Sequence, residues 1–297
     1  MATAALILVT AVWGITFVQV KDAVELYPLV AFLAVRYGIA SATLAAPAAR
    51  RLRGLGREGI AAGLLLGALV AVGIGLQTAG LERTTVTSAG FITGLYVLFT
   101  PLLGLALFRT RIPRELWAAV GLAIVGLALL SGVPEGSGSG DLLVLASTVA
   151  QALQIVMVER YANRFDAFAL TFVQVAVACV AFLAIALALG DLPVPRGATV
   201  WAALLVTGVF AVAFALLVQV WAQRRVSATR IAIIFSLETV FAGLAGYLLA
   251  GDRIGALGLA GCAAIFAGIV IAEPAAAATL RRLVGRPEPA PEPRPPG

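Results

Sequence analysis

Two charged side chains lie inside long apolar runs of the sequence, where a charge is costly. Glu238 lies about eleven residues into the run over 228–250, and Arg36 lies in the run over 28–49. A charged side chain at the centre of a membrane helix costs roughly 2.5–3.5 kcal/mol on insertion scales, so such residues usually face a protein interior or a water-filled cavity. A carboxylate at Glu238 could meet the ammonium group of a solute or change its protonation state, because burial favours its neutral form.

Both charges also have a structural interpretation, in which carbonyls, amides or the opposite charge satisfy them. We interpret Arg36 as a structural intramembrane charge and leave both interpretations of Glu238 open. No second acid accompanies Glu238 at depth in the sequence. Facilitated or weakly coupled movement of a solute is therefore favoured over a proton pump.

Amides and aromatic rings form the larger set of candidate residues within the apolar runs. Glutamine both donates and accepts hydrogen bonds, so glutamines can replace water around an amino or carboxylate group without the desolvation cost of a fixed charge. Aromatic rings deep in a run could stack on an apolar part of a solute. Bonding between helices and filling of the core are the alternatives. The candidate cavity residues are Trp13, Phe17, Gln77, Tyr96, Gln151, Gln154, Gln219 and Glu238.

Small residues and a proline mark the candidate hinges. Many of the 31 glycines fall within the apolar runs, including the pairs Gly63 with Gly67 and Gly90 with Gly94. Small residues let helices approach and slide, although tight packing alone is the alternative for each. We expect Gly90, Gly94 and Pro101 to act as gating or hinge residues.

The apolar runs predict ten membrane-spanning helices. The chain is 61% hydrophobic and 12% charged, with a mean hydropathy of +1.03, whereas soluble domains carry about 25% charged residues. About 20 apolar residues cross the roughly 30 Å hydrocarbon core. The expected spans are approximately 2–20, 28–49, 59–80, 85–108, 115–132, 141–158, 166–189, 198–221, 228–250 and 254–272.

The two halves of the chain resemble each other. Trp13 and Arg36 align with Gln151 and Gln174 at an offset of 138, and later residues align at an offset of 142, as Gln77 does with Gln219. Five spans per copy is an odd number, so the second copy enters the membrane from the opposite side, as in the inverted repeats of secondary transporters. The predicted fold is an all-α membrane protein with ten transmembrane helices as two inverted five-helix repeats around a central cavity. The expected parts are a first repeat over 1–132, an external linker over 133–140, a second repeat over 141–272 and a disordered cytoplasmic Pro/Arg tail over 273–297.

Basic residues fall mainly on one side of the predicted membrane. The opposite side holds only Lys21, Arg83, Arg196 and Arg253. By the positive-inside rule, both termini are expected in the cytoplasm and the protein in the cytoplasmic (inner) membrane. The loops and tail on the N-terminal side hold Arg50, Arg51, Arg53, Arg57, Arg109, Arg111, Arg114, Arg160, Arg164, Arg224, Arg225, Arg230, Arg281, Arg282, Arg286 and Arg294.

Several local motifs resemble the EamA family of the drug/metabolite transporter superfamily. The stretch from Val12 to Phe17, followed by Lys21, Pro28 and Arg36, is similar to the opening motif of that family. The stretch Ser236-Leu237-Glu238-Thr239-Val240-Phe241 before Gly251-Asp252 is similar to its later motif, with Thr239 in place of the usual proline. The resemblance implies ten spans in two repeats. Its nearest form is that of the YddG-type exporters, associated with aromatic and other neutral amino acids.

These patterns favour a secondary or facilitative transporter that exports small neutral metabolites, most of all amino acids including aromatic ones, by alternating access. The alternatives are a transporter of the same superfamily for nucleosides, sugars or drugs, a non-transporting membrane scaffold, or an intramembrane enzyme. The chain has no histidine and no phosphate-binding GxxxxGK[ST] motif, so no enzymatic activity, cofactor, metal or ATP use is expected. The expected partners are a neutral or zwitterionic solute and the lipid bilayer, without nucleic acid, and the oligomeric state is left open.

Overall fold

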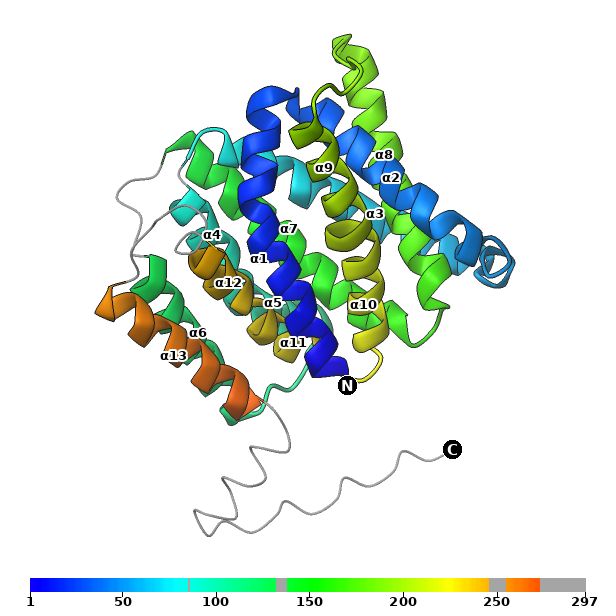
Figure 1. Ribbon diagram of the computed structural model, residues 1–297. Coiled ribbons are helices and arrows are strands. Elements are labelled where there is room, and N and C mark those ends of the chain that lie inside the picture. The colour runs from blue at the N-terminus through cyan, green and yellow to red at the C-terminus, as the bar shows by residue number, and fades with distance from the viewer. Residues whose placement is uncertain (85, 132–137, 246–254, 273–297) are drawn as a thin grey trace.

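The computed structural model describes residues 1–84, 86–131, 138–245 and 255–272, and these residues form helices without a strand (Figure 1). The expected tail over 273–297 and most of the expected linker lie outside the described residues. The first half contains α1 (Ala2–Leu26), α2 (Leu29–Ala49), the 3₁₀ turn η1 (Leu52–Gly54), α3 (Gly56–Leu81), α4 (Val86–Gly94), α5 (Tyr96–Phe108) and α6 (Arg114–Ser131). The second half contains α7 (Ser139–Ala162), α8 (Ala167–Leu189), α9 (Ala198–Val206), the π-helical segment η2 (Thr207–Phe214), α10 (Ala215–Ala222), α11 (Ala228–Phe235), α12 (Leu237–Ala245) and α13 (Ala256–Ala272).

Six helical stretches of the described residues are long and apolar enough to cross a membrane by length and composition. Two shorter apolar helices, Ala2–Thr16 and Ala256–Ala272, correspond to the first and last of the expected spans. The observed bounds mostly agree with the expected ones to within a few residues, and the count of ten spans stays a prediction. The six stretches are Leu29–Ala49, Gly56–Leu81, Ser88–Phe108, Ser139–Ala162, Ala167–Leu189 and Ala198–Ala222.

Two of the expected spans are interrupted near their middles. The span expected over 85–108 is divided at Leu95, between α4 and α5. The span expected over 228–250 is divided at Ser236, between α11 and α12. Pro101 follows the first break and has no N–H with which to bond the Val97 carbonyl four residues earlier. The second break forms without a proline. There the Ser236 hydroxyl donates to the Ile233 carbonyl at 2.6 Å, a back-bond that bends helices.

Glycines set how closely the helices approach one another. A Cβ atom on Gly14 would lie 2.6 Å from Phe241 Cβ and 2.7 Å from the Glu238 carbonyl oxygen, so α1 and α12 touch almost backbone to backbone. Gly63 and Gly67 make the same kind of contact between α3 and α8, as their spacing predicts. Each of these approaches fixes which face of a helix points to the centre of the bundle.

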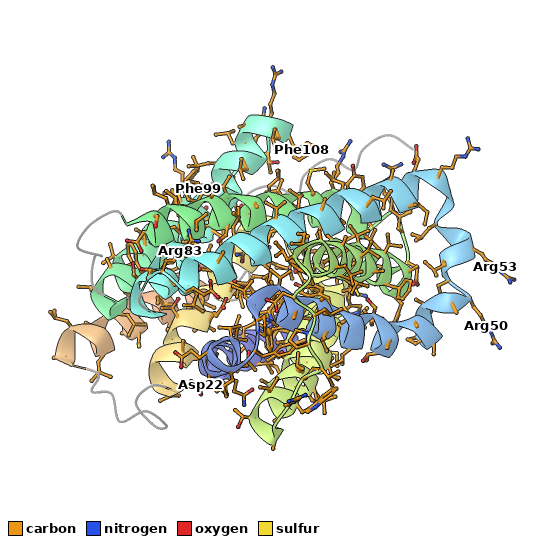
Figure 2. All side chains as sticks on the ribbon, turned by 90° about the horizontal axis from the view of Figure 1, so that it is seen from above. Asp22, Arg50, Arg53, Arg83, Phe99 and Phe108 are labelled. Atoms are coloured by element: carbon orange, nitrogen blue, oxygen red, sulfur yellow. The ribbon has the colours of Figure 1, made fainter. Side chains whose placement is uncertain are left out.

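Most of the described arginines lie at one end of the bundle, which we call the arginine-rich end. There Arg164 pairs with Glu58 at 2.5 Å, and Arg224 donates to the Ala162 and Phe165 carbonyls at 2.9 and 2.6 Å. Seen from above, the labelled arginines of the α2–α3 turn project at one edge of the molecule, away from Asp22 and Arg83 (Figure 2).

Different contacts hold the opposite end of the bundle. Ser88 donates to Asp141 Oδ1 at 2.8 Å, which joins the start of α4 to the start of α7. The Tyr27 hydroxyl donates to the Pro193 carbonyl at 2.6 Å. The two ends therefore differ in charge and in the groups that close them.

Candidate functional site

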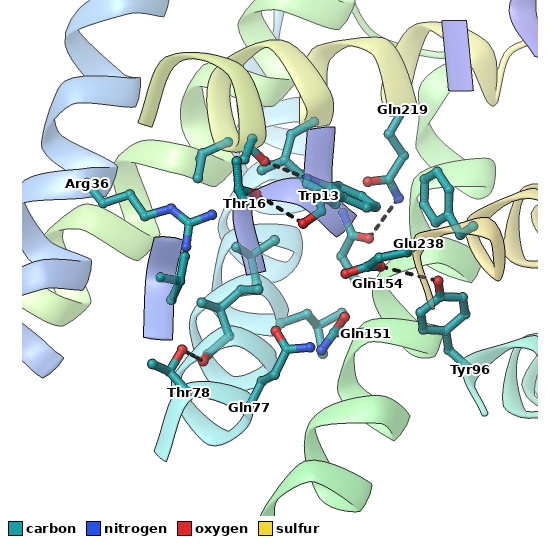
Figure 3. Close-up of a pocket in the computed structure, with 18 of the residues that line it drawn as sticks. Trp13, Thr16, Arg36, Gln77, Thr78, Tyr96, Gln151, Gln154, Gln219 and Glu238 are labelled. Atoms are coloured by element: carbon teal, nitrogen blue, oxygen red, sulfur yellow. Dashed lines mark hydrogen bonds between the residues drawn. The ribbon is translucent and has the colours of Figure 1, made fainter. Parts of the chain in front are cut away.

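A cavity of about 120 Å³ lies in the middle of the bundle (Figure 3). It follows α3 as far as Leu81, the last residue of that helix, and so extends toward the opposite end. Toward the arginine-rich end, its lining stops at Ile155 in α7 and at Gln219 in α10. A single water needs roughly 15 Å³ of such space, so the cavity is large enough to be hydrated or to hold a small solute.

Most of the predicted cavity residues do gather at this cavity. They are Trp13, Gln77, Tyr96, Gln151, Gln154, Gln219 and Glu238. Phe17 lies in α1, but its side chain is outside the described part of the structure. Arg36 also lines the cavity, from α2.

Some lining residues were not predicted from the sequence. Thr16 lies one helical turn from Trp13, so helical spacing from a residue already chosen could have indicated it. Phe235 packs edge-on against Trp13, with ring centroids 4.8 Å apart, and nothing in its local sequence marks it. Gln19, another glutamine within the first expected span, is exposed and does not line the cavity.

Tyr96 and Glu238 meet between the two interrupted helices. Tyr96 is the first residue of α5, and Glu238 is in the first turn of α12, where the helix dipole favours negative charge. The Tyr96 hydroxyl donates to Glu238 Oε2 at 3.5 Å. Figure 3 shows the two side chains pointing toward each other at one side of the cavity. This side of the cavity therefore offers a carboxylate whose hydrogen-bond partner among the described residues is one phenol, at a long distance.

The predicted hinge glycines lie behind this pair. Gly90 and Gly94 line a second cavity of about 20 Å³, which Tyr96 and Glu238 also border. A Cβ on Gly94 would lie 2.7 Å from Leu127 Cδ2, whereas a Cβ on Gly90 would meet nothing closer than 4.0 Å. Pro101 is buried in α5 and lines neither cavity. The two glycines therefore differ in how tightly they are packed.

Four buried glutamines form a hydrogen-bonded network at the arginine-rich limit of the cavity. Gln154 donates to Gln174 Oε1 at 3.1 Å, and Gln219 donates to Gln154 Oε1 at 2.9 Å. Gln219 also donates to Gln223 Oε1 at 3.1 Å, and Gln223 donates to the Ile155 carbonyl at 2.7 Å. The network joins α7, α8 and α10. Gln223 was missed because it lies just beyond the expected end of its span at residue 221.

The indole of Trp13 anchors α1 to the π-helical segment η2. Its Nε1 donates to the Ala211 carbonyl at 2.7 Å, across the wall of the cavity. Segments of π-helix often occur at functional sites, because the wider turn changes the hydrogen-bond ladder. Trp13 therefore positions the wall as well as lining it.

The cavity offers few groups that could hold a metal ion. Glu238 is the carboxylate among its lining residues. Nowhere in the described ranges do three or more His, Cys, Asp or Glu side chains come close enough together to ligate one. What the lining offers instead is amides, aromatic rings, hydroxyls and two opposite charges, a set suited to reversible contacts with a polar organic solute.

A family model and a curated relative both describe a transporter, and a solved structure shares the fold. The family model described as the EamA-like transporter family matches residues 1–132 and again 138–272. An uncharacterized transporter of Archaeoglobus fulgidus is 32% identical over 239 residues, which is 80% of this chain and 75% of that relative. A solved crystal structure, described only as that of a protein, is similar over 95% of this chain and 98% of its own, with a TM-score of 0.77 and 17% identity. That last likeness shows a shared fold.

Proposed function

Because the chain belongs to the EamA-like transporter family of multi-pass membrane proteins, we propose that it exports small neutral or zwitterionic solutes by alternating access. Amino acids, including aromatic ones, are the proposed substrates, and the cytoplasmic membrane is the proposed location. The observation that carries the proposal is a central cavity whose lining residues are related by the internal repeat.

Residues aligned between the two halves line the same cavity. Tyr96 and Glu238 are separated by the offset of 142 and contact each other. Residues that contact their own counterparts must lie near a two-fold axis. The other lining pairs are Trp13 with Gln151 and Thr16 with Gln154 at 138, and Leu69 with Ala211, Val70 with Val212, Ile74 with Leu216 and Gln77 with Gln219 at 142.

The contact between α6 and α13 supports the same relation. A Cβ on Gly126 would lie 2.7 Å from the Gly261 carbonyl oxygen, and a Cβ on Gly268 would lie 2.9 Å from that of Ala119. Gly268 and Gly261 are the counterparts of Gly126 and Ala119 at the offset of 142. Such reciprocal contacts are typical of a two-fold interface. They favour two inverted five-helix repeats, over 1–132 and 141–272, joined by the linker.

The two ends of the cavity differ in a way that suggests two states. At the arginine-rich end, the four glutamines are bonded to one another. Their repeat counterparts, namely Thr16, Arg36, Gln77 and Leu81, all line the cavity, whereas Gln174 and Gln223 of the network do not. An exchange of these two arrangements would close one end and open the other, as in inverted-repeat transporters.

The distribution of the arginines gives the proposed orientation of the protein in the membrane. If the arginine-rich end is cytoplasmic, both termini lie in the cytoplasm, and the cavity extends toward the outside in the state described. Export would then load the solute in the exchanged state and release it in this one. The proposed roles of Gly90 and Gly94 are to let α4 move against α6, with Pro101 weakening α5 nearby.

The lining chemistry supports a neutral or zwitterionic solute. Amides can bond amino and carboxylate groups alike, and the rings of Trp13 and Tyr96 offer apolar faces to a side chain. Glu238 could meet an ammonium group. Among the described residues, it has Tyr96 as its hydrogen-bond partner and no second acid in the cavity wall, which supports facilitated movement over proton pumping.

A competition panel in proteoliposomes tests the substrate proposal. The uptake of labelled phenylalanine would be measured in the presence of aromatic amino acids, other neutral amino acids, nucleosides, sugars and a drug-like cation, each tested in parallel. We expect amino acids to compete and sugars not to. If phenylalanine is not taken up but a labelled nucleoside, sugar or drug is, the protein belongs to another solute class, and the absence of flux for every solute would contradict the transporter proposal.

The role of Glu238 is tested by Glu238→Gln. Losing a charged hydrogen bond to a substrate ammonium costs about 1.5–3 kcal/mol, so we expect the apparent affinity for phenylalanine to fall about tenfold or more. An imposed pH gradient should not drive accumulation in the unaltered protein. Strong accumulation that Glu238→Gln abolishes would show proton coupling instead.

A further inference from the structure

Arg36 has a position that a purely structural charge does not explain. It lies in the interior of α2, it is 9% exposed, and it lines the cavity. A guanidinium keeps its positive charge in proteins, and leaving such a charge unpaired in a buried site is costly. A structural charge is therefore expected to have a partner.

No such partner is found among the residues that the structure describes. Arg36 Nε is buried without a hydrogen bond, and the ion pairs in the described part, Arg51 with Asp166 and Arg164 with Glu58, do not involve it. Glu238 holds the opposite charge in the cavity lining, but it is bonded to Tyr96. Figure 3 places Arg36 and Glu238 on opposite sides of the cavity, with Trp13 and Thr16 between them.

A second donor in the cavity wall is also unpaired. Gln151 lines the cavity, and its Nε2 is buried without a partner in the described residues. Both unpaired groups are donors, so a ligand that satisfied them would have to supply acceptor oxygens. A carboxylate has two such oxygens and matches the planar fork of a guanidinium bidentately.

We propose that Arg36 is the carboxylate-binding group of the cavity and that it selects solutes bearing a carboxylate. The inference rests on the proposed transport function and narrows its substrates to carboxylate-bearing molecules such as amino acids. Glu238, on the other side of the cavity, then favours solutes that also carry an ammonium group. The bound carboxylate supplies the charge that the described protein residues do not.

The test compares three competitors that share a phenyl ring and differ in their charged groups. The uptake of labelled phenylalanine would be measured in proteoliposomes that contain the purified full-length protein. The competitors would be unlabelled phenylalanine, phenylalaninamide and 3-phenylpropionate. Phenylalaninamide has a neutral amide in place of the carboxylate, and 3-phenylpropionate has no ammonium group. We expect the amide to compete at least tenfold more weakly than phenylalanine. In Arg36→Gln, the apparent affinity for phenylalanine should fall about tenfold or more and the preference over the amide should disappear.

Two further variants keep the test interpretable. Arg36→Lys retains the charge without the bidentate fork and should keep part of the preference. Arg83→Gln removes an exposed arginine at the end of α3 and should leave the competition unchanged. If Arg36→Gln does not fold, the competition series in the unaltered protein and in Arg36→Lys still decides the matter.

A binding measurement separates this inference from the transport proposal. Phenylalanine should raise the melting temperature of the detergent-solubilised protein and should not raise that of Arg36→Gln, whether or not flux is detected. A protein that transports phenylalanine but accepts its amide equally well overturns the inference alone. Ligand stabilisation that depends on Arg36, without flux of any solute, supports the inference and contradicts the transport proposal.

Discussion

The glutamine network predicts which end of the protein is held closed. Gln154 makes two side-chain bonds in it, to Gln174 and to Gln219. Hydrogen bonds between membrane helices are worth about 0.6 kcal/mol each on average, so Gln154→Leu should weaken closure of the arginine-rich end by about 1.2 kcal/mol. At 1.4 kcal/mol per factor of ten, the population in which that end is open should rise about sevenfold.

A buried reporter position makes this population measurable. Val220 is 0% exposed in the state described, whereas its repeat counterpart Thr78 lines the cavity. If the two halves exchange arrangements, Val220 comes to line the cavity when the arginine-rich end opens, as Thr78, 4% exposed, does in the state described. The native thiols, Cys179 and Cys262, are free and would be replaced by alanine before Val220→Cys is introduced. A maleimide should then label the new thiol about sevenfold faster in Gln154→Leu than in its parent.

The matched control is Gln19→Leu, the same substitution at an exposed glutamine, which should leave the labelling rate unchanged. An unchanged rate in Gln154→Leu, together with a lower melting temperature, would refute the reasoning. The network would then stabilise the fold in both states rather than closing one end. A rise in both variants would instead indicate a general loosening of the helices.

Two further predictions concern glycines that differ only in their surroundings. Gly14→Ala should lower the melting temperature, because its Cβ would lie 2.6–2.7 Å from atoms of α12 and overpacking costs about 1–3 kcal/mol. Gly121→Ala, with nothing within 4 Å, should be neutral or stabilising. Equal effects of the two substitutions would contradict the close contact between α1 and α12. Gly94→Leu should slow transport while expression stays normal, and the same substitution at the exposed Gly121 should not; normal flux in Gly94→Leu would show that α4 need not move against α6.

The apolar runs and the offsets of the repeat could be predicted from the sequence because both depend on residue order alone. The expected bounds of α2, of α8 and of the stretch from α9 to α10 agree with the structure to within one residue. Among the residues chosen for chemistry, Trp13, Gln77 and Glu238 do reach the cavity. These residues could be selected from the sequence because polar or aromatic groups at membrane depth need partners.

The same reasoning could not assign the faces of the helices. Lipid and protein core are both apolar, so a membrane helix has no polar face to show which side turns inward. Gln19 and Gln154 look alike in sequence, yet one is exposed and the other is 5% exposed. The rotation of each helix is set by contacts such as that of Gly14 with α12, and these exist only in the folded bundle.

The sequence by itself determined a helical membrane chain, its family motifs and a repeat in which Tyr96 and Glu238 are aligned at an offset of 142 residues. Tertiary structure alone decided that these two residues touch, that four glutamines bond at one end and that Arg36 lines the cavity without a described partner. The physical reason is that composition fixes the solvent in which a helix is stable, whereas close packing between helices fixes what each side chain meets.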